Sequence, residues 1–115
     1  MKEILSRLAC LFGVDALLRR LRRGRLVVLM FHGVVAEPLA PFCWHQLPVE
    51  AFGRQMEFVK RHYRVLPLEQ ALTLRAAGRL PPRSLAITFD DGYENVRTVA
   101  APVLAALDLP ATVFL

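Results

Sequence analysis

The chain has 115 residues, of which 55% are hydrophobic, and its formal net charge is +5. This length allows one domain at most, and the high apolar content argues against an intrinsically disordered chain. The two cysteines, Cys10 and Cys43, are too few for a disulfide scaffold, and no run of about 18 apolar residues predicts a membrane-spanning helix.

Residues 1–25 carry the entire net charge, with seven basic and two acidic residues, whereas residues 26–115 hold eight of each. Apolar residues recur at three- and four-residue steps through residues 3–23, which predicts an amphipathic helix that ends near Gly24. We expect this segment either to pack on the rest of the chain or to lie on an anionic membrane surface.

The same N-terminal segment lacks the features of a signal peptide. Asp15 interrupts its apolar run, and no small-x-small cleavage site follows it. We therefore expect a location in the cytoplasm or on the inner face of the membrane. Because the basic excess is confined to residues 1–25, the charge gives no reason to expect a nucleic-acid partner.

Expected strands and helices alternate along residues 26–115. Helical periodicity predicts helices over 49–62, over 68–77 and from Val96 to Leu107, where Pro102 should kink the helix or start a new one. Residues 34–48 contain three prolines and no clear period, which indicates a loop. Apolar runs predict strands at 26–31, 63–66, 84–89 and 111–115.

Strands separated by helices pair in parallel through right-handed crossovers, so the expected fold class is α/β, as a barrel or as an open doubly wound sheet. A (β/α) barrel takes about 200–250 residues. The sequence stops inside the expected strand 111–115. We therefore expect residues 26–115 to be the N-terminal part of a larger domain that is incomplete at its C-terminus.

Two adjacent carboxylates, Asp90 and Asp91, follow the expected strand 84–89, and Gly92 permits a tight turn after them. The carboxyl end of a parallel strand is where α/β folds place their chemistry. Two like charges this close drive their pKa values apart, so one carboxylate can accept a proton while a cation neutralises the other. A phosphotransferase of the haloacid-dehalogenase type is disfavoured, because Gly92 stands where that class needs a second aspartate.

At this point the sequence resembles a known family. The segments 85–93 (LAITFDDGY), 101–104 (APVL) and 109–114 (LPATVF), together with 29–34 (LMFHGV), are similar to the polysaccharide deacetylases of the NodB-homology type, carbohydrate esterase family four. The resemblance implies a distorted (β/α) barrel and a hydrolase that removes acetyl groups from N-acetylated sugars of a polysaccharide, breaking a non-peptide C–N bond. It also implies a divalent metal, usually zinc.

Residue roles follow from the same resemblance. The first aspartate of the family's motif is the general base, which implies that role for Asp90, and the second is a metal ligand, which implies that role for Asp91. A histidine at the end of the first strand is the general acid in members with permuted motifs, which makes His32 the candidate here. Trp44 and Tyr93 are the candidates for contacts to the sugar substrate.

The sequence also departs from the family. The family completes its metal site with a His-x-x-x-His pair after the strand that begins here at Ala111, and no such pair occurs in these 115 residues. Three protein ligands are typical of a catalytic zinc, and this chain offers one clear candidate. The alternatives are therefore a truncated, inactive fragment or a module that binds a membrane surface through residues 1–25.

Overall fold

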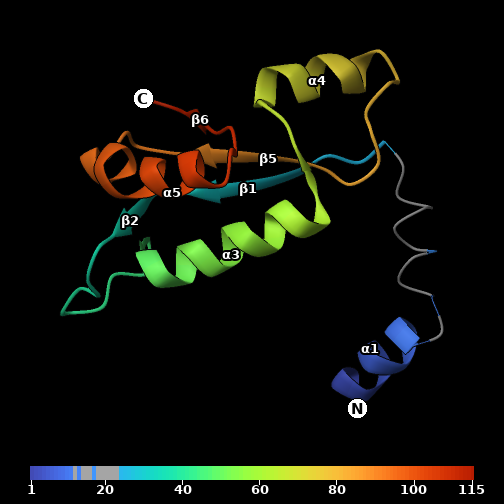
Figure 1. The fold of residues 1–115 in the computed structure, drawn as a ribbon, viewed down its shortest axis with the longest axis horizontal. Coiled ribbons are helices and arrows are strands. Elements are labelled where there is room, and N and C mark those ends of the chain that lie inside the picture. Colours follow the sequence, from blue (N-terminus) through green and yellow to red (C-terminus); the bar gives the residue numbers. More distant parts are fainter. Residues whose placement is uncertain (12, 14–16, 18–23) are drawn as a thin grey trace.

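The computed structural model describes residues 1–11, 13, 17 and 24–115 (Figure 1). Helix α1 spans Lys2–Leu11, which is the first half of the helix predicted over residues 3–23. The rest of that prediction lies largely outside the described residues. None of the described helices is both long enough and apolar enough to cross a membrane.

The main sheet has four strands, all paired in parallel, as the sequence predicts. The central strand pairs along one edge with the first strand, and along its other edge with two short strands, one beside its beginning and one beside its end. The α/β fold class with parallel strands is therefore confirmed. The strands are β1 (Val27–Phe31), β4 (Arg64–Val65), β5 (Ser84–Phe89) and β6 (Thr112–Val113).

Strand β5 is buried at all six positions, as expected of a central strand in a parallel sheet covered on both faces. Its sequence, SLAITF, is apolar apart from two hydroxyl residues, and both hydroxyls find acceptors. Ser84 Oγ donates to Pro81 O at 2.6 Å, and Thr88 Oγ1 donates to Leu29 O at 3.3 Å. Burial of this strand thus leaves neither side-chain hydroxyl unpaired.

Two helices follow the predicted bounds closely and lie on opposite sides of the strands in the view of Figure 1. Helix α3 spans Val49–His62 and α4 spans Leu68–Ala76. Helix α3 buries Phe52, Met56 and Val59, whose four- and three-residue steps place them on one face. These side chains pack against Leu85, Ile87 and Phe89 of β5 in the hydrophobic core.

Pro102 lies where the helical segment after β5 changes its hydrogen-bonding pattern. A π-helical turn, η1 (Val96–Ala100), is followed directly by α5 (Ala101–Ala106), in which Pro102 is the second residue. The Ala101 N–H still bonds to Val96 O, and the missing N–H of Pro102 falls directly after this π-type bond, where the α-helical pattern begins. Val96, Ala100 and Leu104 complete the core from this segment.

The prediction of a loop throughout residues 34–48 is wrong at both ends. Strands β2 (Gly33–Val35) and β3 (Gln46–Pro48) form a separate parallel pair, in which Gly33 lies opposite Gln46. Three residues are too few to show an alternating pattern, so only the pairing of distant segments defines these strands. The residues between them remain irregular.

Candidate active site

The candidate residues meet at the edge of the sheet where β1 and β5 end. Phe31 lies opposite Phe89 in the parallel register, and the Asp90 N–H donates to Phe31 O at 2.8 Å. His32 and Asp90 therefore follow two paired strands at the same edge, which confirms the predicted topology. Strand β6 reaches this edge too, because the Phe114 N–H donates to Phe89 O at 2.8 Å.

The turn after β5 depends on two residues with left-handed backbone conformation. Asp91 has φ +69° and Gly92 has φ +59°. Aspartate is among the few non-glycine residues that adopt this conformation readily, and glycine adopts it without steric cost.

This turn brings Asp91, rather than Asp90, close to the histidine. His32 Nε2 lies 3.9 Å from Asp91 Oδ2, and the two side chains are 24% and 61% exposed. The separation permits an ion pair when the imidazole is protonated, weakened by the solvent around the carboxylate. Asp90 is half-buried at the strand end beside them.

Aromatic rings surround His32. Its ring centroid lies 5.8 Å from that of Trp44 and 6.2 Å from that of His45. His45 in turn stacks against Tyr93 at 6.1 Å, and Cys43 Sγ lies 3.8 Å from the ring nitrogens of His45. Trp44 is 79% exposed, so its ring is free to cover the apolar face of a ligand.

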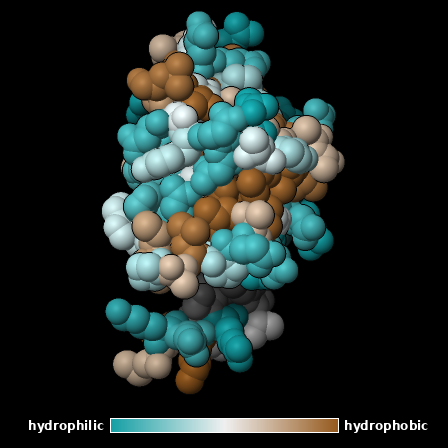
Figure 2. Space-filling model, turned by 90° about the vertical axis from the view of Figure 1, so that its left-hand side faces the viewer, coloured by the Kyte–Doolittle hydropathy of each residue, from teal (hydrophilic) through white to brown (hydrophobic). Residues whose placement is uncertain are grey.

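Figure 2 views the molecule from the side that is on the left in Figure 1, towards which β1 and β5 run. An apolar band crosses this side between polar side chains. Besides Trp44, the exposed large apolar residues of the chain include Phe42 and Phe114, which belong to the loop and the strand end nearest the site. A contiguous exposed apolar band of this kind marks a surface for ligands or for further protein.

Two amide side chains that sequence reasoning missed connect the segments on either side of the site. Asn95 Oδ1 accepts a hydrogen bond from the Val34 N–H at 3.3 Å, and Asn95 Nδ2 donates to Gln46 Oε1 at 2.7 Å. Gln46 is only 8% exposed, and Val34 is fully buried. Asn95 thus connects the segment after the Asp91–Gly92 turn to both β2 and β3, the strands that follow His32 and His45.

Gly33 makes room for this network. A Cβ on Gly33 would collide with Gln46 Oε1, and the Gly33 N–H donates to His45 O at 3.2 Å. No periodicity marks Gln46 or Asn95 in the sequence. The only sequence signal is the position of Asn95, a polar residue directly before the buried Val96.

The Glu94 carboxylate, which lies near the site in the sequence, is already paired with an arginine. Arg97 Nε donates to Glu94 Oε1 at 3.0 Å, and this hydrogen bond together with the guanidinium charge holds the pKa of the Glu94 carboxyl below its usual value. Both side chains are largely exposed. Glu94 is therefore a poor candidate for a proton acceptor, which leaves Asp90 and Asp91.

The described residues do not form a complete metal site. Within this part of the chain, no three His, Cys, Asp or Glu side chains are grouped so that they could hold a metal ion together. Asp91 and His32 offer one oxygen and one nitrogen donor at a shared edge, which is fewer than the three protein ligands of a catalytic zinc. A metal bound here would need ligands from outside this set.

Comparison with known families agrees with the motif. The family model described as polysaccharide deacetylase matches residues 77–115, which include β5, the Asp90–Asp91 pair and β6. The resemblance predicted from the sequence is therefore confirmed.

Relatives and solved structures extend the match. The poly-β-1,6-N-acetyl-D-glucosamine N-deacetylase of Staphylococcus epidermidis is 34% identical over 67 residues, which cover 57% of this chain and 23% of that protein. The structure of IcaB from Ammonifex degensii matches with a TM-score of 0.67 at 28% identity, over 77% of this chain and 37% of that one. The Streptococcus pyogenes deacetylase PplD matches in fold, with a TM-score of 0.69 at 24% identity, over 76% and 41%.

Proposed function

We propose, because residues 77–115 match the polysaccharide deacetylase family and the curated relatives carry that activity, that the protein is a deacetylase of this family and hydrolyses the acetamide groups of N-acetylglucosamine residues in a polysaccharide. The chain matches less than a quarter of the length of the staphylococcal relative, so the activity is proposed for the complete domain to which these residues contribute. A polymer of β-1,6-linked N-acetylglucosamine is the first substrate to test, because the relatives are named for it.

The observation that carries this proposal is the meeting of His32 with Asp90 and Asp91 at one edge of the sheet. In the proposed reaction, Asp90 accepts a proton from the attacking water, and His32 gives a proton to the departing amine. A histidine suits the second step because its pKa lies near neutrality, and a half-buried carboxylate within hydrogen-bond reach of water suits the first.

We further propose that Asp91 is one ligand of a divalent metal, with zinc as the family's usual ion. When bound, such an ion supplies a Lewis acid that polarises the acetamide carbonyl. The remaining ligands would come from outside the described residues, since these supply no complete set.

The aromatic residues around His32 suit a sugar ligand. Trp44 is exposed beside the His32 imidazole, and Tyr93 stacks on the neighbouring His45 ring. An aromatic face covers the apolar C–H face of a pyranose ring, while the His32 and Asp91 side chains are available to its polar groups. We propose that Trp44 and Tyr93 border the subsite of the sugar that loses its acetyl group.

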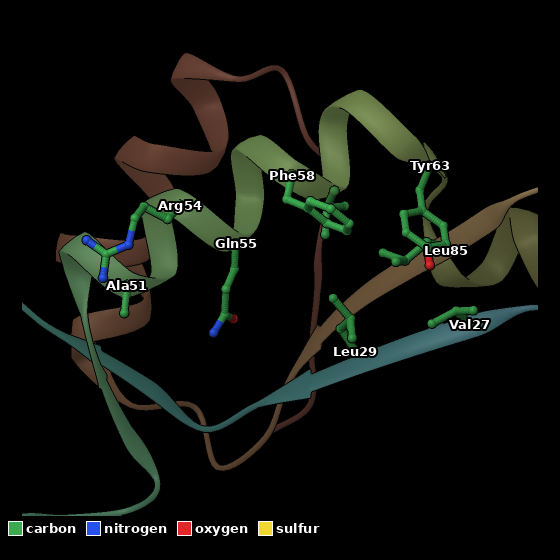
Figure 3. Close-up of a pocket in the computed structure, with 9 residues that line it drawn as sticks. Val27, Leu29, Ala51, Arg54, Gln55, Phe58, Tyr63 and Leu85 are labelled. Carbon is green, nitrogen blue, oxygen red and sulfur yellow. The ribbon is translucent and has the colours of Figure 1, made fainter. Parts of the chain in front are cut away.

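A (β/α) barrel is the proposed architecture of the complete domain. Among the described residues, no strand pairs with the second edge of β1, and a groove of about 500 Å³ lies open between β1 and α3. Figure 3 shows Leu29 of β1 and Gln55 and Phe58 of α3 facing this space. An open edge beside an apolar groove is what the next strand of a closing barrel would cover.

The test is acetate release from a β-1,6-linked N-acetylglucosamine pentamer by the full translation product of the gene. We expect release by the unaltered protein and a fall of about 10²–10⁴-fold in His32→Gln, the usual loss when a general acid is removed. His62→Gln is the matched control, since His62 ends α3 away from this edge. Absence of acetate with both β-1,6- and β-1,4-linked oligomers, or equal rates for the two variants, would overturn the proposal.

A further inference from the structure

Two adjoining hollows lie at the end of the sheet where β1 and β5 begin, opposite the edge that carries Asp90. One measures about 310 Å³ and the other about 280 Å³, and they share His62, Tyr63 and Arg83 among their lining residues. Arg25 lines the first hollow, and Arg61 and Arg64 line the second. Among the described residues that line either hollow, none carries a carboxylate.

The arginines are exposed, and the backbone keeps two of them side by side. The Arg64 N–H donates to Arg83 O at 2.8 Å, and Arg64 lies opposite Ser84 in the register of β4 and β5. Arg83 itself has φ +59°, a conformation that costs energy for a residue with a long side chain. Four arginines gathered without an acidic partner in the hollows form a surface, here called the basic end, that attracts anions.

The basic end is continuous with the segment that carries the net charge of the protein. Arg25 is the last residue of that segment and lies in the first hollow. In Figure 1, α1 lies on the side of the molecule where β1 begins. Ile4 and Leu5 of α1 are 63% and 59% exposed, although both are large and apolar.

We propose that the basic end and α1 together form a docking surface for an anionic phospholipid bilayer. Exposed apolar side chains on a helix that belongs to the same basic segment as Arg25 suit a lipid surface, where the apolar groups enter the headgroup boundary and the arginines meet phosphate groups. A soluble polyanion such as a nucleic acid would use the arginines but would leave Ile4 and Leu5 in water. The apolar residues therefore favour the membrane.

If the protein docks on the bilayer through the basic end, the opposite end of the sheet points away from the lipid. Strand β5 has six residues, and a rise of about 3.3 Å per residue separates its ends by roughly 17–20 Å. This separation is about twice the Debye length of roughly 8–10 Å at physiological ionic strength. The edge with His32 and Asp90 would thus face away from the bilayer. Only this orientation rests on the proposed function; the binding itself rests on the charges and on α1.

The experiment measures flotation of the 115-residue chain with phosphatidylcholine vesicles that contain either no phosphatidylglycerol or 30 mol% of it. We expect binding only to the anionic vesicles. The variant Arg61→Gln/Arg64→Gln should bind about 10- to 30-fold more weakly, because each arginine near an anionic surface contributes roughly a factor of five. Arg54→Gln/Arg97→Gln removes the same charge away from both hollows and should bind less than about threefold more weakly.

A further arm adds a single-stranded oligonucleotide or inorganic phosphate as competitor, and circular dichroism checks that each variant is folded. Equal binding to both kinds of vesicle, equal losses in the two double variants, or displacement from vesicles by a stoichiometric oligonucleotide would each overturn the proposal. Retained binding in the presence of millimolar phosphate supports a surface rather than a site for one free ion. Because no catalysis is measured, a failure here leaves the proposed deacetylase activity untouched, and the reverse also holds.

Discussion

Replacing Asn95 by leucine tests whether the amide network holds the two sides of the site together. The substitution removes the acceptor of the Val34 N–H and the donor to Gln46 Oε1, and both of these partners are buried. Each buried polar group left without a partner costs about 1–3 kcal/mol. After a partial offset from the added apolar surface, we expect the free energy of unfolding to fall by about 2–4 kcal/mol.

Urea unfolding followed by far-ultraviolet circular dichroism measures this loss. With a denaturant slope of about 2 kcal/mol per molar urea, the midpoint should fall by roughly 1–2 M. Thr98→Val is the matched control, because Thr98 Oγ1 donates only to the exposed Glu94 carbonyl, at 3.3 Å, and its loss should cost less than about 0.5 kcal/mol.

A second variant separates the hydrogen bonds from the shape of the side chain. Asn95→Asp keeps the acceptor for the Val34 N–H, and the Gln46 amide can turn so that its Nε2 donates to the new carboxylate. We expect this variant to lose less than half as much stability as Asn95→Leu. The reasoning is refuted if Asn95→Leu unfolds within about 0.5 kcal/mol of the unaltered chain, which is the level expected of a neutral surface change.

Two further substitutions probe the packing and the surface of the same site. Gly33→Ala should lower the free energy of unfolding by about 1–3 kcal/mol, because its Cβ would collide with Gln46. Gly53→Ala in α3 is the control and should raise it by about 0.5–1 kcal/mol, because a Cβ there meets no atom within 4 Å. Urea midpoints that do not separate the two variants would contradict the packing argument. Trp44→Ala should leave the thermal midpoint unchanged, because Trp44 is exposed. Calorimetry should show that it binds an N-acetylglucosamine oligomer about 3- to 10-fold more weakly. An unchanged affinity would remove Trp44 from the sugar subsite.

The elements that the sequence predicts well are those with a strong local pattern. Helix α3 occupies the predicted range 49–62, because Phe52, Met56 and Val59 mark its buried face. Strand β5 occupies the predicted range 84–89, because a run of apolar residues ends at a pair of carboxylates and a glycine. Its parallel pairing with β1 follows from the helices between the strands, and this pairing brings His32 and Asp90 to one edge.

The features that the sequence does not reveal depend on contacts between distant segments. Strands β2 and β3 are too short to show a period, and they form only because residues 33 and 46 meet. The bond from Asn95 to Gln46 joins residues 49 positions apart, and no local pattern selects either amide. The proximity of His32 to Asp91 rather than Asp90 follows from the left-handed turn at Asp91, which is a property of the folded backbone.

The unequal roles of Asp90 and Asp91 are the central claim, and one paired measurement tests them directly. Bound metal and the rate of acetate release are measured for the full translation product carrying Asp90→Asn or Asp91→Asn, at low and at high zinc. We expect Asp91→Asn to lose metal and to recover part of its rate at high zinc. Asp90→Asn should keep its metal and lose about 10²–10⁴-fold in rate, without recovery. Loss of metal in Asp90→Asn with retention in Asp91→Asn would exchange the two roles, and full activity of both variants would contradict the account.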